Sequence, residues 1–438
     1  MSPLWRNRTY RRLFAAQVVA LTGTGLLTVA LGLLAFDLAG DRAGAVLGAV
    51  YTIKMIAYVG LSPLAQAWVQ RLPRRAVLIG ADLIRAGVAL CLPFVSEVWQ
   101  IYVLIFALQS ASATFTPAYQ ATLPDVLPDE DDYTQALSLS RLAYDLENLT
   151  SPALAGLLLS VLSYSNLFLG TVAGFLASAL LILSVALPPV PAQSQARPFS
   201  ERVTRGVRLY LATPRLRGLL SLTLAAAAAG AFVLVNTVVL VRSGYGRDET
   251  ALAVAMAAFG AGSMTAALAL PAVLRRLRDR TVMTASAAGL IAAMAVTAVS
   301  LGGALPGWPV FLLLWAGTGA LYSAIQTPGG RLLRRSSGPE DRPALFAAQF
   351  ALSHACWLVT YPLAGWAGAA LGMSGALWVL TVLALAGLVS ALRFWPRGLP
   401  AHRHADLPPG HPHLREHPLD EGGRHDHAIL HDGLHRGL

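Results

Sequence analysis

Charged residues are scarce in this sequence. They make up 13% of the 438 residues, whereas 55% are hydrophobic, and the mean hydropathy is +0.57. A soluble domain carries about 25% charged residues, because its surface must be solvated. The first 395 residues contain no such charged shell. The sequence therefore predicts an all-α membrane protein and excludes an ordinary soluble domain.

Cysteine, lysine and the common enzyme motifs are also nearly absent. Only Cys91 and Cys356 occur, both within apolar runs, which excludes a disulfide framework. Lys54 is the single lysine. The sequence contains no Walker A loop, His-Glu-x-x-His, Gly-x-Ser-x-Gly or Cys-x-x-Cys motif. We therefore expect no enzyme, no nucleotide-driven pump and no tightly bound cofactor.

Long apolar runs predict twelve membrane helices, since a span needs roughly 20 mainly apolar residues. The runs cover residues 13–36, 44–69, 76–95, 99–119, 136–162, 167–187, 219–241, 251–274, 281–301, 310–325, 344–371 and 376–395. Basic clusters after the second helix of each half indicate an internal repeat. We expect two six-helix bundles (1–187 and 218–395), a basic linker (188–217) and a tail (396–438) without assigned structure.

Arginine placement predicts how the helices are oriented. Clusters at the N-terminus and at 71–75, 197–217, 275–280 and 331–342 fall on a terminus or on every second gap. Cytoplasmic loops accumulate arginine, so both termini are predicted to lie in the cytoplasm. The net charge of +10 then reflects topology. We expect the bilayer and a transported substrate as partners, no nucleic acid, and a monomer.

The linker is predicted to contain an amphipathic helix that lies on the membrane surface. Its apolar residues recur every four positions and so share one helical face. These residues are Phe199, Val203, Val207 and Leu211.

The tail holds nine of the ten histidines among Pro, Gly and charged residues. Imidazole suits Ni, Co, Zn and Cu, so the composition indicates metal capture. The alternative is a solvated terminus whose histidines do nothing. The candidate ligands are His402, His404, His411, His413, His417, His425, His427, His431 and His435.

The gap after the second predicted helix resembles the signature loop of the major facilitator superfamily. That loop has a Gly, three residues, Asp-Arg, two residues and Arg-Arg. Arg71, Arg74 and Arg75 match it, whereas Gln66 and Gln70 replace the Gly and the Asp. The resemblance implies two pseudo-symmetric six-helix bundles and a gate at this loop, with altered gating because the superfamily Asp helps to latch one conformation. The 151–156 segment (SPALAG) is similar to an element of proton antiporters.

Four further segments resemble the NreB-type nickel-resistance permeases. These are residues 6–11 (RNRTYR), 53–58 (IKMIAY), 123–130 (LPDVLPDE) and the histidine-rich terminus. Those permeases are inner-membrane exporters of nickel with a histidine-rich C-terminal extension. The resemblance implies export of cytoplasmic Ni²⁺.

Ionisable residues within predicted spans are candidates for function, since each costs at least ~2.5 kcal/mol at bilayer depth. The fifth helix carries Arg141, Asp145, Glu147 and Asn148. At 100° per residue Glu147 points nearly opposite to the other three. Arg141 and Asp145 stand four residues apart, so an ion pair within the helix is as good an explanation as a substrate role.

Three other positions have competing explanations. Asp82 and Arg85 are spaced for an ion pair within the third helix. Lys54 could neutralise Glu147 or Asp145 and so form part of a proton site. His354, the one histidine outside the tail, is either a hydrogen-bonded core residue or a metal or proton contact.

From these features we expect a secondary-active exporter of Ni²⁺, or else Co²⁺, driven by the proton motive force. Two alternatives remain open. One is an exporter of an organic molecule, such as a siderophore, drug or metal chelate, with a regulatory tail. The other is a membrane-anchored metal sensor or buffer that acts through its tail.

Overall fold

The computed structural model describes residues 3–40, 43–189, 198–303, 305–396, 401–402 and 425–426. The N-terminal half consists of α1 (Pro3–Arg6), α2 (Arg8–Ala39), α3 (Ala43–Ile56), η2 (Ala57–Leu61), α4 (Ser62–Val69), α5 (Arg74–Cys91), η3 (Leu92–Phe94), α6 (Val98–Val126), α7 (Glu130–Leu159) and α8 (Tyr164–Leu183). The linker contains α9 (Phe199–Ala212).

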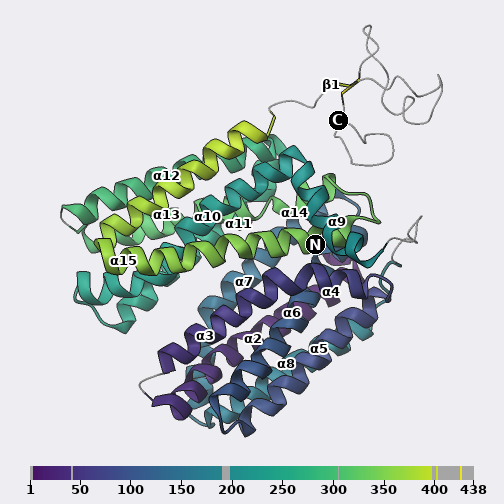
Figure 1. The fold of residues 1–438 in the computed structure, drawn as a ribbon, viewed down its shortest axis with the longest axis horizontal. Helices are drawn as coiled ribbons and strands as arrows, with labels where there is room; N and C mark the ends of the chain where they lie inside the picture. The colour runs from purple at the N-terminus through teal and green to yellow at the C-terminus, as the bar shows by residue number, and fades with distance from the viewer. Residues whose placement is uncertain are drawn as a thin grey trace.

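The C-terminal half consists of α10 (Pro214–Val239), η4 (Leu240–Gly244), α11 (Glu249–Arg276), α12 (Asp279–Gly302), α13 (Trp308–Gln326), α14 (Gly329–Arg335) and α15 (Arg342–Phe394). In the described part of the tail, β1 (Ala401–His402) pairs antiparallel with β2 (His425–Asp426). No structure is predicted for the tail from the sequence, so this short strand pairing differs from that expectation. Figure 1 shows that the two halves form separate helical bundles.

Ten helices of the described chain are long and apolar enough to cross a membrane. Helix α7 is not among them, and α15 is one 53-residue element that contains a turn. Gly372 interrupts α15 with a φ of 73°, which is the left-handed region that favours glycine. The chain reverses its direction there (Figure 1). The prediction of twelve spans stays a prediction.

Close helix packing at small residues recurs in the two bundles. Gly174 of α8 lies against α2, where a Cβ atom would sit 2.7 Å from the carbonyl oxygen of Val19. Gly387 of α15 lies against α10, where a Cβ atom would sit 2.6 Å from the carbonyl oxygen of Ser221. Helices in a bilayer associate by such backbone approach, because burial of apolar side chains adds little there. The first and last helices of each bundle therefore pack in the same way.

The linker helix α9 packs against the C-terminal bundle through residues beside the predicted apolar face. Gly206 and Tyr210 are buried, and a Cβ atom on Gly206 would lie 2.2 Å from the carbonyl oxygen of Ala344. Phe199 and Leu211, at the ends of the predicted apolar face, remain exposed, as they would on a helix that lies on a membrane surface. The prediction of a surface-lying helix stays a prediction.

Candidate functional site: the interface between the two bundles

The two bundles meet around α9 and α14 and diverge toward the opposite end (Figure 1). We call the end that carries α9, α14 and residues 125–131 the closed end. Interbundle contacts begin near this end, where the hydroxyl of Ser62 donates to the carbonyl of Ala347 at 3.4 Å, and reach to the level of His354, against which the ring of Tyr58 packs. The site therefore has two parts, a set of ion pairs at the closed end and a polar cluster near mid-membrane.

The first ion-pair set, which we call the first triad, consists of Arg74, Asp125 and Arg342. Arg74 begins α5 and its Nη1 lies 2.5 Å from Oδ2 of Asp125 near the end of α6. Arg342 begins α15 and pairs with the other oxygen of the same carboxylate. The three side chains are 6%, 16% and 10% exposed. Asp125 therefore ties an arginine of its own bundle to an arginine of the other bundle.

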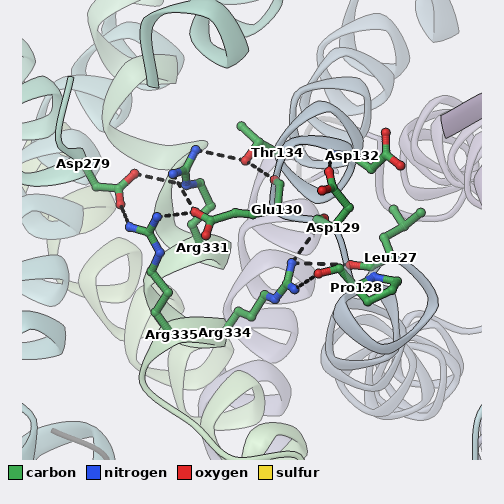
Figure 2. A network of polar contacts seen from close by, with 10 residues as sticks. All are labelled: Leu127, Pro128, Asp129, Glu130, Asp132, Thr134, Asp279, Arg331, Arg334 and Arg335. Carbon is green, nitrogen blue, oxygen red and sulfur yellow. Dashed lines mark hydrogen bonds and ion pairs between the residues drawn. The ribbon is translucent and has the colours of Figure 1, made fainter. Parts of the chain in front are cut away.

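The second triad consists of Glu130, Asp279 and Arg331, and Arg335 is a further partner of both acids (Figure 2). Nη2 of Arg331 lies 2.7 Å from Glu130, and Nη1 of Arg335 lies 2.6 Å from Asp279. Arg331 also pairs with Asp279 at 3.3 Å, and Arg335 pairs with Glu130. Glu130 belongs to α7 and Asp279 to α12, so this network also crosses between the bundles.

Two further contacts hold α14 against α7. Nη1 of Arg331 donates to the hydroxyl of Thr134 at 3.0 Å. Arg334 donates to the backbone carbonyls of Leu127, Pro128 and Asp129, which precede α7 (Figure 2). These bonds satisfy the end of α6 and position the start of α7.

The predicted gating loop contributes one residue to this arrangement. Arg74 enters the first triad, whereas Arg75 donates to the carbonyl of Leu183 at the end of α8 and Arg71 is exposed. Gln70, in place of the superfamily Asp, donates to the carbonyl of Ala67 at 3.1 Å. Gln70 and Arg74 line a cleft together with Arg205 of α9. Asp125 supplies the acid that the loop lacks.

Arg205 connects α9 to the segment before α15. Its Nε and Nη2 donate to the two carboxylate oxygens of Asp341 at 2.5 and 2.7 Å. These hydrogen bonds raise the pKa of Arg205, which stays charged. Such a two-point pair fixes α9 to the C-terminal bundle.

A second cluster lies near the middle of the helices, on both sides of the interface. Tyr58 of η2 packs edge-on against the ring of His354 of α15, with ring centroids 4.7 Å apart. The ammonium of Lys54 lies 5.6 Å from the centre of the Tyr58 ring. Lys54 also interacts electrostatically with both Glu147 and His354. The structure therefore brings three predicted residues from three helices together, and adds Tyr58.

The local backbone and its neighbours position the side chains of this cluster. Tyr58 lies in η2, a π-helical turn that follows Lys54, and such turns frequently occur at functional sites. Its hydroxyl donates to Gln109 at 2.9 Å. Glu147 lies beside Gly25 of α2, where a Cβ atom would be 3.6 Å from its Cγ. Glu147 and His354 are both partly exposed, so solvent or substrate can reach them.

Asp145 and Arg141 have a different environment from Glu147. They form the ion pair expected within α7, at 2.8 Å. The pair also reaches the other bundle, because the hydroxyl of Ser263 on α11 donates to Asp145 at 2.6 Å and Arg141 lies 4.9 Å from the Tyr322 ring centre. These residues join the bundles. The side chain of Asn148 lies outside the described residues.

Among the remaining predicted residues, Asp82 and Arg85 lie inside the N-terminal bundle, where Arg85 also interacts electrostatically with Tyr58. Asp82 and Arg85 pair within α5, and the Arg85 guanidinium lies between the rings of Phe115 and Phe175, 4.2 and 4.5 Å from their centres. Of the tail histidines, His402 and His425 stand opposite each other in the β1–β2 register. The other seven lie outside the described residues. Within the described chain, no three His, Cys, Asp or Glu side chains form a group that could hold a metal ion.

Several residues that matter here were not predicted from the sequence. They are Asp125, Glu130, Asp279, Arg331, Arg335, Arg342 and Tyr58. One feature could have indicated several of them, because charged residues begin four of the helices. These residues are Arg74, Glu130, Asp279 and Arg342. Charges at the starts of equivalent helices in two halves of a repeat could have been compared with one another.

Comparison with known proteins agrees with this architecture. The chain is similar to the crystal structure of the human organic anion transporter MFSD10 (TETRAN), with a TM-score of 0.73, 14% identity, and coverage of 89% of this chain and 100% of the other. It is also similar to a bacterial homologue of the iron transporter ferroportin in an outward-facing state, with a TM-score of 0.72, 14% identity, and coverage of 88% and 99%. At these identities the likeness concerns the fold.

Sequence relatives cover a smaller part of the chain. Macrolide efflux protein A of Streptococcus pyogenes is 26% identical over 189 residues, 42% of this chain and 46% of the relative. The uncharacterized MFS-type transporter YfiS of Bacillus subtilis is 29% identical over 183 residues, 41% of this chain and 43% of the relative. The chain thus matches less than half the length of each.

The family model of the Major Facilitator Superfamily matches residues 13–297, more than half of the chain. The chain therefore belongs to the Major Facilitator Superfamily and is a multi-pass membrane transporter.

Proposed function

We propose that this transporter is a proton-coupled exporter of a divalent transition metal, Ni²⁺ first and Co²⁺ second. The observation that carries the proposal is the cluster in the middle of the helices, in which Lys54 interacts electrostatically with Glu147 of its own bundle and with His354 of the other. An acid and an imidazole on opposite bundles offer donors to an ion that binds between them. Rocking of the bundles about such a site would expose it to each side in turn.

The orientation that we propose places the closed end in the cytoplasm. Arg74, Arg331 and Arg335 lie there, and positive charge accumulates on the cytoplasmic side. The conformation is then outward-open. We also infer twelve crossings, because α15 turns back at Gly372 and crosses twice, and the 30 residues of α7 suffice for one more crossing.

Proton coupling follows from the chemistry of Glu147. A carboxylate binds a metal ion only when it is deprotonated, so entry of a proton from outside releases the ion. The protonated carboxyl then carries the proton inward as the site returns without metal, and the nearby charge of Lys54 favours release of that proton into the cytoplasm before the next ion binds. A transported ion needs only a small number of protein ligands, because it keeps some of its water ligands and must be released again.

The proposal is tested with everted membrane vesicles. Under an imposed proton gradient, vesicles with the wild-type protein should accumulate ⁶³Ni²⁺, and vesicles with Glu147→Gln should not. Exchange of Ni²⁺ across the vesicle membrane without a gradient, measured for the Glu147→Gln variant, separates loss of coupling from loss of folding. Glu97→Gln is the matched control, because it changes an exposed residue. Equal accumulation in wild-type and empty-vector vesicles contradicts metal export.

A second candidate function is export of an organic molecule. It is favoured by the aromatic stripe of α15, formed by Phe350, His354, Trp357 and Tyr361 at spacings of four, three and four residues. Ring contacts join neighbours along it, with centroids 4.3 Å apart for Phe350 and His354 and 4.9 Å apart for Trp357 and Tyr361. Macrolide efflux by a relative agrees with this class. Proteoliposome transport of free Ni²⁺ compared with a Ni²⁺ chelate or a macrolide distinguishes the two.

A further inference from the structure

The end of α15 meets the start of α10 on the outer side of the C-terminal bundle. Arg217 lies in the first turn of α10, and its guanidinium carbon is 4.9 Å from the ring centre of Phe394, the last residue of α15. Phe394 is 41% exposed, and Arg393 beside it is exposed as well. Arg215 donates to the backbone carbonyl of Arg335, which places this turn of α10 at the closed end.

Two contacts fix the end of α15 in this position. A Cβ atom on Gly218 would lie 2.8 Å from the Cβ of Trp395, so glycine allows α10 to approach the end of α15 closely. Nε of Arg280, at the start of α12, donates to the carbonyl oxygen of Trp395 at 3.1 Å. The side chains of Arg393 and Phe394 are therefore presented from a backbone that α10 and α12 hold in place.

The charges of Arg217 and Arg393 are not balanced by the chain. Within the residues that the structure describes, neither arginine pairs with a carboxylate, whereas Arg74 and Arg335 at the same end do. The start of α10 also disfavours positive charge, because the helix dipole is positive there. The preference of arginine for cytoplasmic loops explains its side of the membrane, but not its stacking on an exposed ring. An anion from outside the chain would balance these charges.

Apolar side chains lead from this site along the membrane-facing surface of α15. Leu385, Val389 and Leu392 follow one another at spacings of four and three residues, so they share one face of the helix. They are 47%, 57% and 47% exposed. Arg393 stands four residues after Val389 and lies beside the same face. An exposed apolar stripe that ends in positive charge matches a phospholipid, whose acyl chains are apolar and whose phosphate is an anion.

We propose that Arg217, Phe394 and Arg393 bind the phosphate of an anionic phospholipid, such as phosphatidylglycerol, in the leaflet at the closed end. Under the proposed orientation this is the cytoplasmic leaflet. The ring of Phe394 holds the guanidinium of Arg217, so that its terminal nitrogens donate to the phosphate. Basic sites between membrane helices on the cytoplasmic side bind such headgroups. All three residues belong to the C-terminal bundle, so the lipid stays bound when the bundles move.

Native mass spectrometry of the purified full-length protein tests this site. The protein is delipidated in detergent and titrated with phosphatidylglycerol or with phosphatidylcholine of the same acyl chains. Wild type should bind one phosphatidylglycerol more tightly than phosphatidylcholine. Arg217→Gln and Arg393→Gln should each weaken phosphatidylglycerol binding roughly fivefold, and together roughly 25-fold, since each basic residue near an anionic headgroup contributes about that factor. Binding of phosphatidylcholine should not change.

Two further variants separate the site from its surroundings. Arg11→Gln is the matched control, because Arg11 is an exposed arginine at the fourth position of α2, as Arg217 is at the fourth position of α10. It should leave phosphatidylglycerol binding unchanged. Phe394→Leu keeps both charges but removes the ring, and it should weaken binding roughly threefold, whereas Phe394→Tyr should not.

The thermal midpoint in phosphatidylcholine shows whether a variant is folded. Phosphatidylglycerol should raise the midpoint of wild type and of Arg11→Gln, and it should raise that of the double arginine variant less. If Arg217→Gln lowers the midpoint in phosphatidylcholine, Arg393→Gln decides the outcome alone, because Arg393 is exposed.

Three results would overturn the proposal. The first is equal affinity of wild type for phosphatidylglycerol and phosphatidylcholine. The second is an equal loss of binding in Arg11→Gln, which would make the effect one of general charge. The third is displacement of the lipid by an equal concentration of glycerol 3-phosphate, which would indicate a site for a soluble anion. These measurements do not involve transport, so they decide the lipid site independently of metal export.

Discussion

Neighbouring residues on α7 have separate tasks because each faces a different partner. Asp145 is 5% exposed and is held by Arg141 and by Ser263 of the other bundle. Glu147, two residues further on, interacts with Lys54 and is partly exposed. A carboxylate with its hydrogen bonds satisfied stabilises the structure, whereas one beside an open interface can exchange its partner. We therefore assign coupling to Glu147 and bundle contact to Asp145.

The Asp145→Asn substitution tests this assignment at the level of stability. It leaves the Arg141 guanidinium without its carboxylate in a mostly buried position, which should cost about 3 kcal/mol. The thermal midpoint of the purified protein should fall accordingly. Ser263→Ala, the control, removes one hydrogen bond and should cost about 1 kcal/mol. Equal midpoints for wild type and Asp145→Asn would contradict a bridging role.

Helix α9 fits closely against the C-terminal bundle. It is held to α15 by the Arg205–Asp341 pair and by the hydroxyl of Tyr210, which donates to Gln349. Its buried Gly206 lies against the backbone of Ala344. Because these contacts all lie on the C-terminal bundle, α9 is expected to move with that bundle when the closed end opens.

Gly206→Ala should displace α9 from α15. The added Cβ would lie 2.2 Å from a backbone oxygen that cannot rotate away, and such overpacking costs about 1–3 kcal/mol. Trypsin should then cleave faster at the arginines of α9. Gly80→Ala in α5 is the matched control, since no atom lies within 4 Å of its added Cβ. Unchanged cleavage in Gly206→Ala would show that α9 is not held at this point.

For the whole molecule, the proposed orientation separates the transport site from the tail. The end of α15, which precedes the tail in the sequence, lies at the closed end (Figure 1), whereas Glu147 and His354 lie in the interior of α7 and α15. A cytoplasmic tail cannot itself carry an ion across, but it can raise the metal concentration at the inward entrance. Neutral imidazole binds metal, so this effect should fade as pH falls below the ordinary pKa of histidine.

Truncation after Pro400 tests that division of labour. An exporter without its tail should keep its maximal Ni²⁺ export rate in cells, with a higher concentration needed for half-maximal export. Replacing the nine tail histidines by glutamine in the full-length chain is the matched control and should have the same effect. Complete loss of export in the truncated form would instead favour a sensor or buffer that acts through its tail.

The sequence by itself determined the membrane class, the two halves and the superfamily. Runs of about 20 apolar residues have few alternatives to helices in a bilayer, because every backbone polar group must be satisfied within the segment. The pairings within helices, such as Arg141 with Asp145, were also predictable, because their spacing places them on one face.

Only the tertiary structure decided which charges meet between the bundles. Gln70 in place of the superfamily Asp suggested altered gating, and Asp125 supplies a carboxylate in the same region from α6. Lys54 had two possible acidic partners, and its proximity to Glu147 follows from how α3 and α7 are placed. The contacts of Arg342 with Asp125 and of Arg335 with Glu130 link residues more than 200 positions apart. Local periodicity carries no information about such contacts, because they depend on how two independently folded bundles dock.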